Sequence, residues 1–474
     1  MKNNKYGVLL AISSLPSDYG IGDFGANAYK FADFLAKRGY KYWQILPLNP
    51  IGPGNSPYMS TCSEAIEPRY IDLNELVELG YLNKLSKNDP NSKSVDYQQV
   101  GIFKEKYLYK AFLNFLKNPL KGYDSFKKNN KWVYPFAVYT VVRKHRNNQT
   151  WIDWPYEWKF YYINNKIEDI PDVIKTECEF QMFMQFIAYR QWNNLKKYIN
   201  KKGIKVIADC PFYVGIDSVD CWLNKDQFVM NERYQPTLVS GCPPDAFSDD
   251  GQLWGTPIYD FNKMKENKYS FLINRISYLA STCDYLRIDH FRAFDTYYVI
   301  KAEEKTAING EWWNCPGYEI LDKLFATKKD IELIAEDLGD LFPSVLELRD
   351  RLNLPGMYIV EFTLFDPNAR GSDGMIVYTG THDNETLYGW IKGLKDHERA
   401  ELRNRFHCQD RYLYDRIIKY TLSLPSKMTI FPLQDLLKLD NKARMNVPGT
   451  CGFPNFCWRM KDFDILKKAK FKIK

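Results

Sequence analysis

Carboxyl groups stand where four short apolar segments of the chain end, at Asp209, Asp289, Glu336 and Asp383. They lie too far apart in sequence for one helix or strand to relate them, so only the folded chain can bring them together. An acid at the end of a strand often does no more than cap the next helix. Four such acids, two of them beside His290 and His382, favour a shared carboxylate site instead.

Paired carboxyl groups are the machinery that breaks glycosidic bonds. Cleavage with retention needs a carboxylate nucleophile and a protonated acid about 5–5.5 Å apart. A further acid can stabilise the positive charge that develops on the sugar ring. Arg287 is expected on the same strand face as Asp289 and would keep that acid ionised, the alternative being a simple salt bridge at the rim. Glu336 follows the apolar segment 333–335, which suits an acid with a raised pKa.

The elements that must position these acids are short and apolar. Eight such segments alternate with helical patterns, and the stripe of apolar residues over 28–35, closed by Gly39, predicts one of these helices. Continuous apolar segments suit strands buried on both faces of a parallel sheet. The pattern predicts an α/β fold, a (β/α)8 TIM barrel, in which the carboxyl ends of all strands share one rim. The predicted strands are Gly7–Ile12, Tyr42–Leu48, Lys205–Asp209, Tyr285–Asp289, Glu332–Glu336, Met357–Phe362, Ile376–Thr379 and Met428–Phe431.

The chain is longer than a bare barrel, which needs about 250 residues, since it has 474. The surplus is expected in insertions after the second, third and fourth strands. Residues 72–203 are predicted to be mostly helical, residues 210–268 to form a loop-rich cover over the substrate cleft, and residues 300–330 to follow the fourth strand. No linker bounds these segments, so residues 1–474 are expected to form a single catalytic barrel.

Composition excludes several classes of protein. The 65 basic and 58 acidic residues give a net charge of only +7, which makes nucleic acid a poor partner. No apolar segment approaches the roughly 18 residues that cross a membrane, and the amino-terminal apolar segment is too short for a typical secretion signal. The ten cysteines are scattered without metal or redox spacing, which is typical of reduced thiols and favours the cytoplasm. The oligomeric state is not predicted.

Two further patterns could mark a nucleotide-binding site or a metal-binding site. Gly20–Gly25 matches the G-x-G-x-x-G fingerprint of dinucleotide-binding enzymes, between a predicted strand and a helix. Asp23 would repel the pyrophosphate, and no acid between Asp33 and Glu64 could bind the ribose, so a plain turn is favoured over an oxidoreductase. A metal-dependent hydrolase is also disfavoured, because the five histidines form no metal-binding motif. We therefore expect no metal and no organic cofactor.

Read together, the segments around the acids resemble glycoside hydrolase family 77, the 4-alpha-glucanotransferases that include bacterial amylomaltase and the plastid disproportionating enzyme. The resemblance extends from about Gly7 to Arg459, and the loop with Pro-Pro-Asp and Gly-Gln-Leu-Trp-Gly is its most specific part. The matching stretches are Ser56–Tyr58, Ala208–Val214, Gly241–Asp245, Gly251–Gly255, Arg287–Arg292, Ala335–Gly339, Gly380–Asn384 and Arg444–Thr450.

The resemblance implies roles for individual residues. It makes Asp289 the nucleophile, Glu336 the acid/base and Asp383 the stabiliser of the transition state. Ala246 stands where the family usually has tyrosine, which leaves the acceptor side open. The implied substrate-binding residues are Tyr58, Asp209, Trp254, Arg287, His290 and His382.

The implied activity is transfer of a segment of an α-1,4-glucan to the 4-hydroxyl of another glucan or of glucose. It would proceed by a retaining double displacement through a covalent glycosyl ester on Asp289, with α-1,4-glucans and maltooligosaccharides as partners. Two alternatives remain at this point. The same machinery with water as acceptor would be an α-1,4-glucan hydrolase of the α-amylase clan, and a more remote alternative is a non-catalytic glucan-binding barrel.

Overall fold

The computed structural model describes residues 5–89, 93–244, 248–339 and 341–469. Eight parallel strands form its central sheet, in the order β10-β11-β12-β1-β2-β3-β6-β9. The backbone N–H of Ala335 in β9 donates to the carbonyl of Pro355, just before β10, at 2.9 Å, so the two ends of this order meet. The predicted (β/α)8 barrel is confirmed. Its strands are β1 (Tyr6–Leu9), β2 (Tyr42–Gln44), β3 (Lys205–Pro211), β6 (Tyr285–Asp289), β9 (Leu333–Ala335), β10 (Met357–Ile359), β11 (Ile376–Tyr378) and β12 (Met428–Pro432).

Alternate residues of the strands fill the interior of the barrel, because successive side chains of a strand point to opposite faces. The same strand faces carry polar groups where they approach the rim: Asp209 follows Ile207 at a spacing of two, and Arg287 follows Tyr285. The interior is therefore apolar toward the amino ends of the strands and charged at their carboxyl ends. Its buried apolar side chains are Leu9, Tyr42, Ile207, Ile334, Met357, Ile359, Ile376, Tyr378, Met428 and Ile430.

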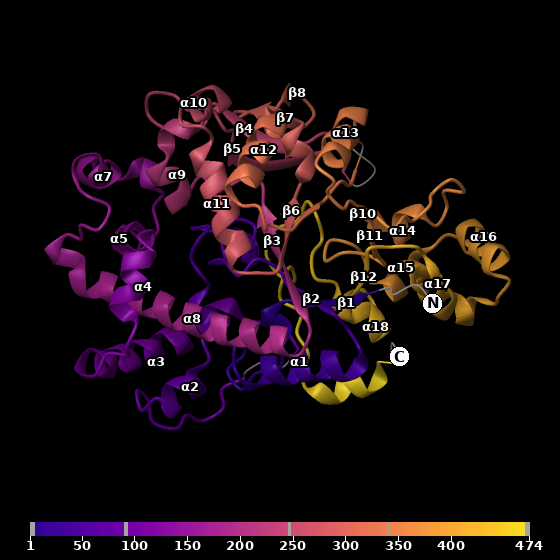
Figure 1. Cartoon of the computed structure of the whole chain (residues 1–474), viewed down its shortest axis with the longest axis horizontal. Helices are drawn as coiled ribbons and strands as arrows, with labels where there is room; N and C mark the ends of the chain where they lie inside the picture. Colours follow the sequence, from indigo (N-terminus) through magenta and orange to yellow (C-terminus); the bar gives the residue numbers. More distant parts are fainter. Residues whose placement is uncertain (1–4, 90–92, 245–247, 340, 470–474) are drawn as a thin grey trace.

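Helices cover the outside of the barrel. The first, α1 (Ala26–Arg38), buries the predicted apolar stripe and ends at Gly39, whose φ of 88° is the left-handed conformation that glycine adopts readily. The later helices are α11 (Ser270–Ser281), α12 (Gly317–Thr327), α13 (Pro343–Arg351), α14 (Val360–Thr363), α15 (Leu387–Gly393), α16 (Asp396–Phe406), α17 (Asp410–Ser423) and α18 (Leu433–Leu436). In Figure 1 α11, α12 and α13 lie in the upper part of the view, and α14 to α18 lie on the right.

The chain between β2 and β3 forms a helical layer, which lies on the left of Figure 1. Its longest helix, α8, packs against α1 and β3 as well as against its neighbours in the layer. The layer is thereby held to the barrel wall. Its helices are α2 (Leu73–Glu78), α3 (Tyr97–Lys117), α4 (Tyr123–Asn129), α5 (Val133–His145), α6 (Tyr156–Lys159), α7 (Tyr161–Asn164) and α8 (Lys175–Lys201).

A buried lysine joins this layer to the glycine-rich turn before α1. The ammonium group of Lys104 in α3 donates to Asp23 at 3.0 Å and to the carbonyls of Arg69 and Ile71 at 2.7 and 2.8 Å. Asp23 also accepts the backbone N–H of Gly25. The G-x-G-x-x-G segment is therefore a turn whose acid is committed to an internal ion pair.

A second sheet, antiparallel and in the order β5-β4-β7-β8, lies above β3 and β6 in Figure 1. It joins the segment between β3 and β6, which was expected to be rich in loops, to the segment between β6 and β9. Ala246 and Phe247, between β4 and β5, lie outside the described residues. The elements are β4 (Leu238–Cys242), β5 (Gln252–Pro257), β7 (Thr296–Lys301) and β8 (Gly310–Asn314), with the short helices α9 (Val219–Leu223) and α10 (Phe261–Glu266) nearby in sequence.

Among the helices of the described ranges, none combines the length and apolar character needed to cross a membrane.

The Lys104–Asp23 pair generates a prediction about stability. Replacing Lys104 with methionine should lower the free energy of unfolding by about 3 kcal/mol or more, because removing one partner of a buried pair leaves the other charge uncompensated. Burial already raises the pKa of Asp23 to about 6 against the opposing effect of Lys104. Urea denaturation at neutral pH would measure the loss. Lys106→Met, on the exposed part of the same helix, is the control and should lower the free energy of unfolding by less than about 0.5 kcal/mol. Equal losses in the two variants would show that the Lys104–Asp23 pair does not stabilise the fold.

Candidate active site

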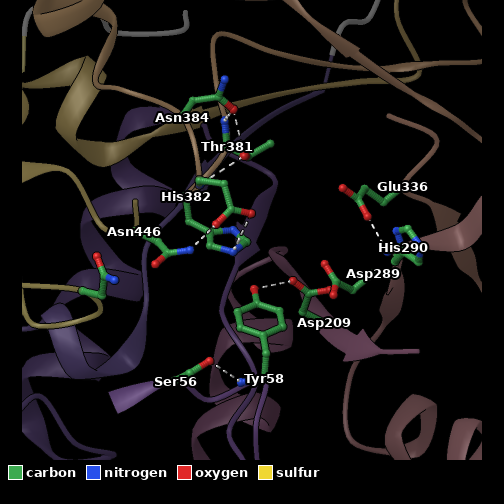
Figure 2. A network of polar contacts seen from close by, with 12 residues as sticks. Ser56, Tyr58, Asp209, Asp289, His290, Glu336, Thr381, His382, Asn384 and Asn446 are labelled. Atoms are coloured by element: carbon green, nitrogen blue, oxygen red, sulfur yellow. Dashed lines mark hydrogen bonds and ion pairs between the residues drawn. The ribbon is translucent and has the colours of Figure 1, made fainter. Parts of the chain in front are cut away.

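Strand register brings the predicted acids together at the carboxyl rim of the barrel. Asp209 in β3 is the partner of Arg287 in β6, and the next inward-facing residue of β6 is Asp289. Glu336 follows β9 directly, beside the end of β6. Asp383 follows β11, in a loop whose residues His382 and Asn384 lie across the site from Glu336 and His290 in Figure 2.

A buried guanidinium lies at the centre of three of these acids. Arg287 is 1% exposed, and its Nη1 lies 2.7 and 2.6 Å from the two carboxylate oxygens of Asp209. The same nitrogen lies 3.0 Å from Asp289, and Nη2 lies 3.4 Å from Glu336. The expected contact between Arg287 and Asp289 is thus present, but the guanidinium is shared among three carboxyl groups.

Exposure divides the four acids. The side chain of Asp209 is fully covered, whereas those of Asp289, Glu336 and Asp383 are 27%, 19% and 36% exposed. Only the last three reach the open surface of the site and can touch a ligand directly in this conformation. Asp209 instead holds Arg287 and the hydroxyl of Tyr58, which donates to it at 2.8 Å.

Burial sets the protonation of the two acids beside Arg287. It raises the pKa of Glu336 to about 7, while Arg287 and a hydrogen bond from the backbone N–H of His290 lower it. Burial also raises the pKa of Asp289 well above its usual range, again opposed by Arg287. Since three carboxyl groups contact one guanidinium, holding a proton relieves their mutual repulsion. The site is therefore able to keep one carboxyl protonated and another ionised near neutral pH.

His290 lies beside Glu336 in the left-handed conformation, with φ of 55°. Burial and the nearby Arg292 lower its pKa to about 3, so the imidazole is neutral. The indole of Trp254, from β5 of the second sheet, meets the imidazole edge-on with 4.8 Å between ring centroids. Trp254, one of the expected substrate-binding residues, therefore lies at the edge of the acid cluster.

The opposite side of the site carries Asp383, beside His382 and Asn446. One carboxylate oxygen accepts a hydrogen bond from the side-chain amide of Asn446 at 2.7 Å, and the other lies 3.3 Å from Nε2 of His382. Arg444 donates to the backbone carbonyl of the same aspartate at 2.7 Å. Burial lowers the pKa of His382, which favours a neutral donor beside the acid.

Tyr58 connects the two sides. Its hydroxyl bonds to Asp209, and its ring stacks on His382 with a centroid distance of 5.2 Å and an interplanar angle of 6°. Burial and Asp209 raise the pKa of this phenol well above its usual range, so it stays a hydrogen-bond donor. The loop after β2 thus spans the rim beneath the acids.

All the predicted site residues lie in this one cluster. Sequence reasoning assigned no role to Asn446, although the stretch around it was part of the resemblance. No spacing relates Asn446 to Asp383, because the two meet only when the chain after β12 returns to the rim. Among the described residues, the group spaced to hold an ion is Cys62, Glu64 and Asp220, which contains neither His290 nor His382.

Comparisons with known proteins agree with the resemblance found in the sequence. The chain is 38% identical over 466 residues to the 4-alpha-glucanotransferase of Clostridium butyricum, covering 95% of each protein. It is 35% identical to the chloroplastic/amyloplastic enzyme of Solanum tuberosum, over 96% of this chain and 82% of that one. The structure of amylomaltase from Streptococcus agalactiae in complex with acarbose matches with a TM-score of 0.92 and 34% identity, over 98% of this chain and 97% of the other. The pattern of the family described as 4-alpha-glucanotransferase matches residues 10–466. The chain therefore belongs to glycoside hydrolase family 77, the 4-alpha-glucanotransferases.

Proposed function

We propose that the chain transfers segments of α-1,4-glucans to the 4-hydroxyl of another glucan or of glucose, through a covalent intermediate on Asp289. The observation that carries this proposal is the acid pair beside Arg287. Asp289 and Glu336 contact the same guanidinium, both reach the open surface, and burial favours a proton on the pair. Retaining glycosidic cleavage needs these two forms of the carboxyl group.

In the first step, a carboxylate oxygen of Asp289 attacks the anomeric carbon of the donor sugar. The bond from that carbon to the glycosidic oxygen breaks, and Glu336 gives its proton to the departing oxygen. Positive charge develops on the sugar ring as the bond breaks. Asp383, held by Asn446 and His382 on the other side, stabilises that charge through its carboxylate.

In the second step, the oxygen of the acceptor's 4-hydroxyl attacks the anomeric carbon. The ionised Glu336 takes the proton of that hydroxyl. The ester bond to Asp289 breaks, and the configuration of the donor is restored. Transfer exceeds hydrolysis when a sugar hydroxyl reaches the ester more often than water does. A sugar-binding cover on the acceptor side produces this preference.

The other predicted residues shape the donor side. Tyr58, His290, His382 and Trp254 surround the acids and offer rings and neutral donors to a sugar. Arg287 and Asp209 are covered, so we assign them the task of orienting Tyr58 and Asp289. The amylomaltase of Streptococcus agalactiae was solved with acarbose bound, which supports α-1,4-glucans and maltooligosaccharides as substrates.

We also propose that residues 1–474 act as one catalytic unit in the cytoplasm. The segments 72–203, 210–268 and 300–330 are then insertions of the barrel, and the second of them covers the substrate cleft. The contact of Trp254 with His290 supports this cover. The ten cysteines are scattered along the chain without metal or redox spacing, which is typical of reduced thiols and supports a reducing compartment.

Replacing Asp289 with asparagine should lower kcat for maltotriose disproportionation by about a thousandfold or more, because the nucleophile is lost. Folding should persist, since Arg287 keeps two other carboxyl partners. Rates would be measured by chromatography of the products, with circular dichroism as the folding check. The exposed Asp322→Asn in α12 serves as the control at wild-type rate, and wild-type transfer by the Asp289 variant would remove that residue from the mechanism.

Glu336→Gln should lose far more activity on maltotriose than on glucosyl fluoride, whose leaving group departs without protonation. For the same reason, the wild-type rate on maltotriose should fall as the pH rises above about 7, where Glu336 loses its proton. The first step with the fluoride should lack this alkaline limb. Equal losses on both donors would show that Glu336 is not the acid.

Incubation with maltotriose alone distinguishes transfer from hydrolysis. A transferase should produce glucose and a ladder of longer chains, with few new reducing ends, because each cleaved bond is replaced by another. Chromatography would resolve the chain lengths, and a reducing-sugar assay would count the ends. If reducing ends rise in step with maltotriose loss and no product exceeds three sugars, the chain is a hydrolase.

A further inference from the structure

A buried acid outside the catalytic cluster lies behind the loop that carries Asp383. Glu361, in the short helix α14 after β10, is 5% exposed. Its Oε1 atom has no hydrogen-bond partner among the described residues. A methyl group added at Gly380 would lie only 3.2 Å from this atom, so the carboxyl group packs directly against the backbone of the loop.

The loop over 380–384 is closed by its own side chains (Figure 2). Oδ1 of Asn384 accepts the backbone N–H of Thr381 at 2.8 Å and its hydroxyl at 2.9 Å. The Thr381 hydroxyl oxygen in turn accepts the backbone N–H of Asp383 at 3.2 Å. Asn384 therefore determines where Asp383 stands. The methyl group considered at Gly380 would also lie 2.9 Å from Cβ of Asn384, so Glu361 and Asn384 flank the same point of the backbone.

The surroundings of Glu361 carry charge of mostly its own sign. Asp435, in α18 and fully buried, accepts the hydroxyl of Thr379 at 2.6 Å and the backbone N–H of Leu387 at 2.8 Å. The backbone N–H of Glu361 donates to the carbonyl of the same Thr379 at 3.2 Å. The carboxylate of Asp435 and the backbone N–H of Glu361 thus both bind Thr379, just before Gly380.

Burial and this neighbourhood favour an uncharged Glu361. Burial is the largest cause that raises its pKa well above the usual range, followed by Asp435 and then Glu385. Asn384 and Arg444 lower it in opposition. An uncharged carboxyl group can lie against a second acid without repulsion and can offer its O–H as a donor.

We propose that Glu361 is a positioning residue, which packs against the backbone at Gly380 and thereby fixes the loop over 380–384 and the carboxylate of Asp383. The inference rests on the proposed role of Asp383 and adds to it the group that holds that residue in place. Small displacements of a group that meets the transition state cost rate without weakening binding to the same degree. The expected signature is a loss in kcat with KM nearly constant.

Two substitutions of Glu361 separate position from mere packing. Glu361→Gln keeps the shape and a donor, and its kcat for maltotriose should stay near the wild-type value. Glu361→Leu fills the space without a polar end and should lower kcat by about tenfold or more, with KM within about twofold. Tyr358→Phe removes a buried hydroxyl of β10 for which the described part of the chain offers no hydrogen-bond partner, and the kcat of this control should equal that of the wild type. A folded leucine variant with wild-type kcat would overturn the proposal.

The route through Asn384 is tested by a double-mutant cycle. Asn384→Ala should lower kcat to a similar degree, and adding Glu361→Leu should cost little more, because both changes release the same loop. If the two losses in kcat multiply in the double variant, Glu361 does not act through Asn384. Asp383→Asn distinguishes this inference from the proposed function: if that variant keeps its activity while Glu361→Leu loses it, the role proposed for Asp383 fails.

The pH dependence of the melting temperature tests whether Glu361 is uncharged. This measurement does not need a folded Glu361→Leu variant. An acid whose pKa is raised by folding makes the protein lose stability as the pH rises from its unfolded pKa to its folded pKa. Glutamine does not titrate. The melting temperature of Glu361→Gln should therefore rise relative to that of the wild type as the pH is raised from about 5.5 to about 8.5. A difference that stays constant over this range would overturn the uncharged state.

Discussion

The guanidinium of Arg287 is the one positive charge on which the acid cluster depends. It lies on the inner face of β6, and register with β3 places Asp209 beside it. Burying several carboxyl groups without a cation would leave their charges uncompensated at a cost of several kcal/mol. Because one cation serves three acids, compensation is incomplete, and a proton remains on the cluster. That incomplete compensation is what provides both a base and an acid within one site.

The rest of the molecule arranges what meets this cluster. The loop after β2 brings Tyr58 under the rim, where its ring supports His382 and its hydroxyl holds Asp209. The second sheet brings Trp254 against His290 from above. The chain after β12 brings Asn446 to Asp383. Three segments outside the barrel strands therefore enclose the acids, and each acts through a residue of the rim.

Much of this could be predicted from the sequence because it follows local rules. Continuous apolar segments marked all eight strands, and the acids at their ends could meet only if those strands closed into a barrel. The contacts that could not be predicted are those between segments without a common period. The strand Gln252–Pro257 carries its glycine and proline within a sheet that draws on two insertions, so its composition indicated a loop. Asn446 and Glu361 lack any spacing relation to Asp383, and only the folded rim unites them.

The pair formed by Lys104 and Asp23 has a consequence for the boundaries of the domain. Asp23 belongs to the turn between β1 and α1, and Lys104 belongs to the helical layer, so removing that layer to shorten the chain would separate the two groups. A minimal barrel made in this way would retain a buried carboxyl group without its counter-ion. We therefore expect the barrel and the layer to unfold together, and we do not expect the layer to be exchangeable between relatives as a separate module.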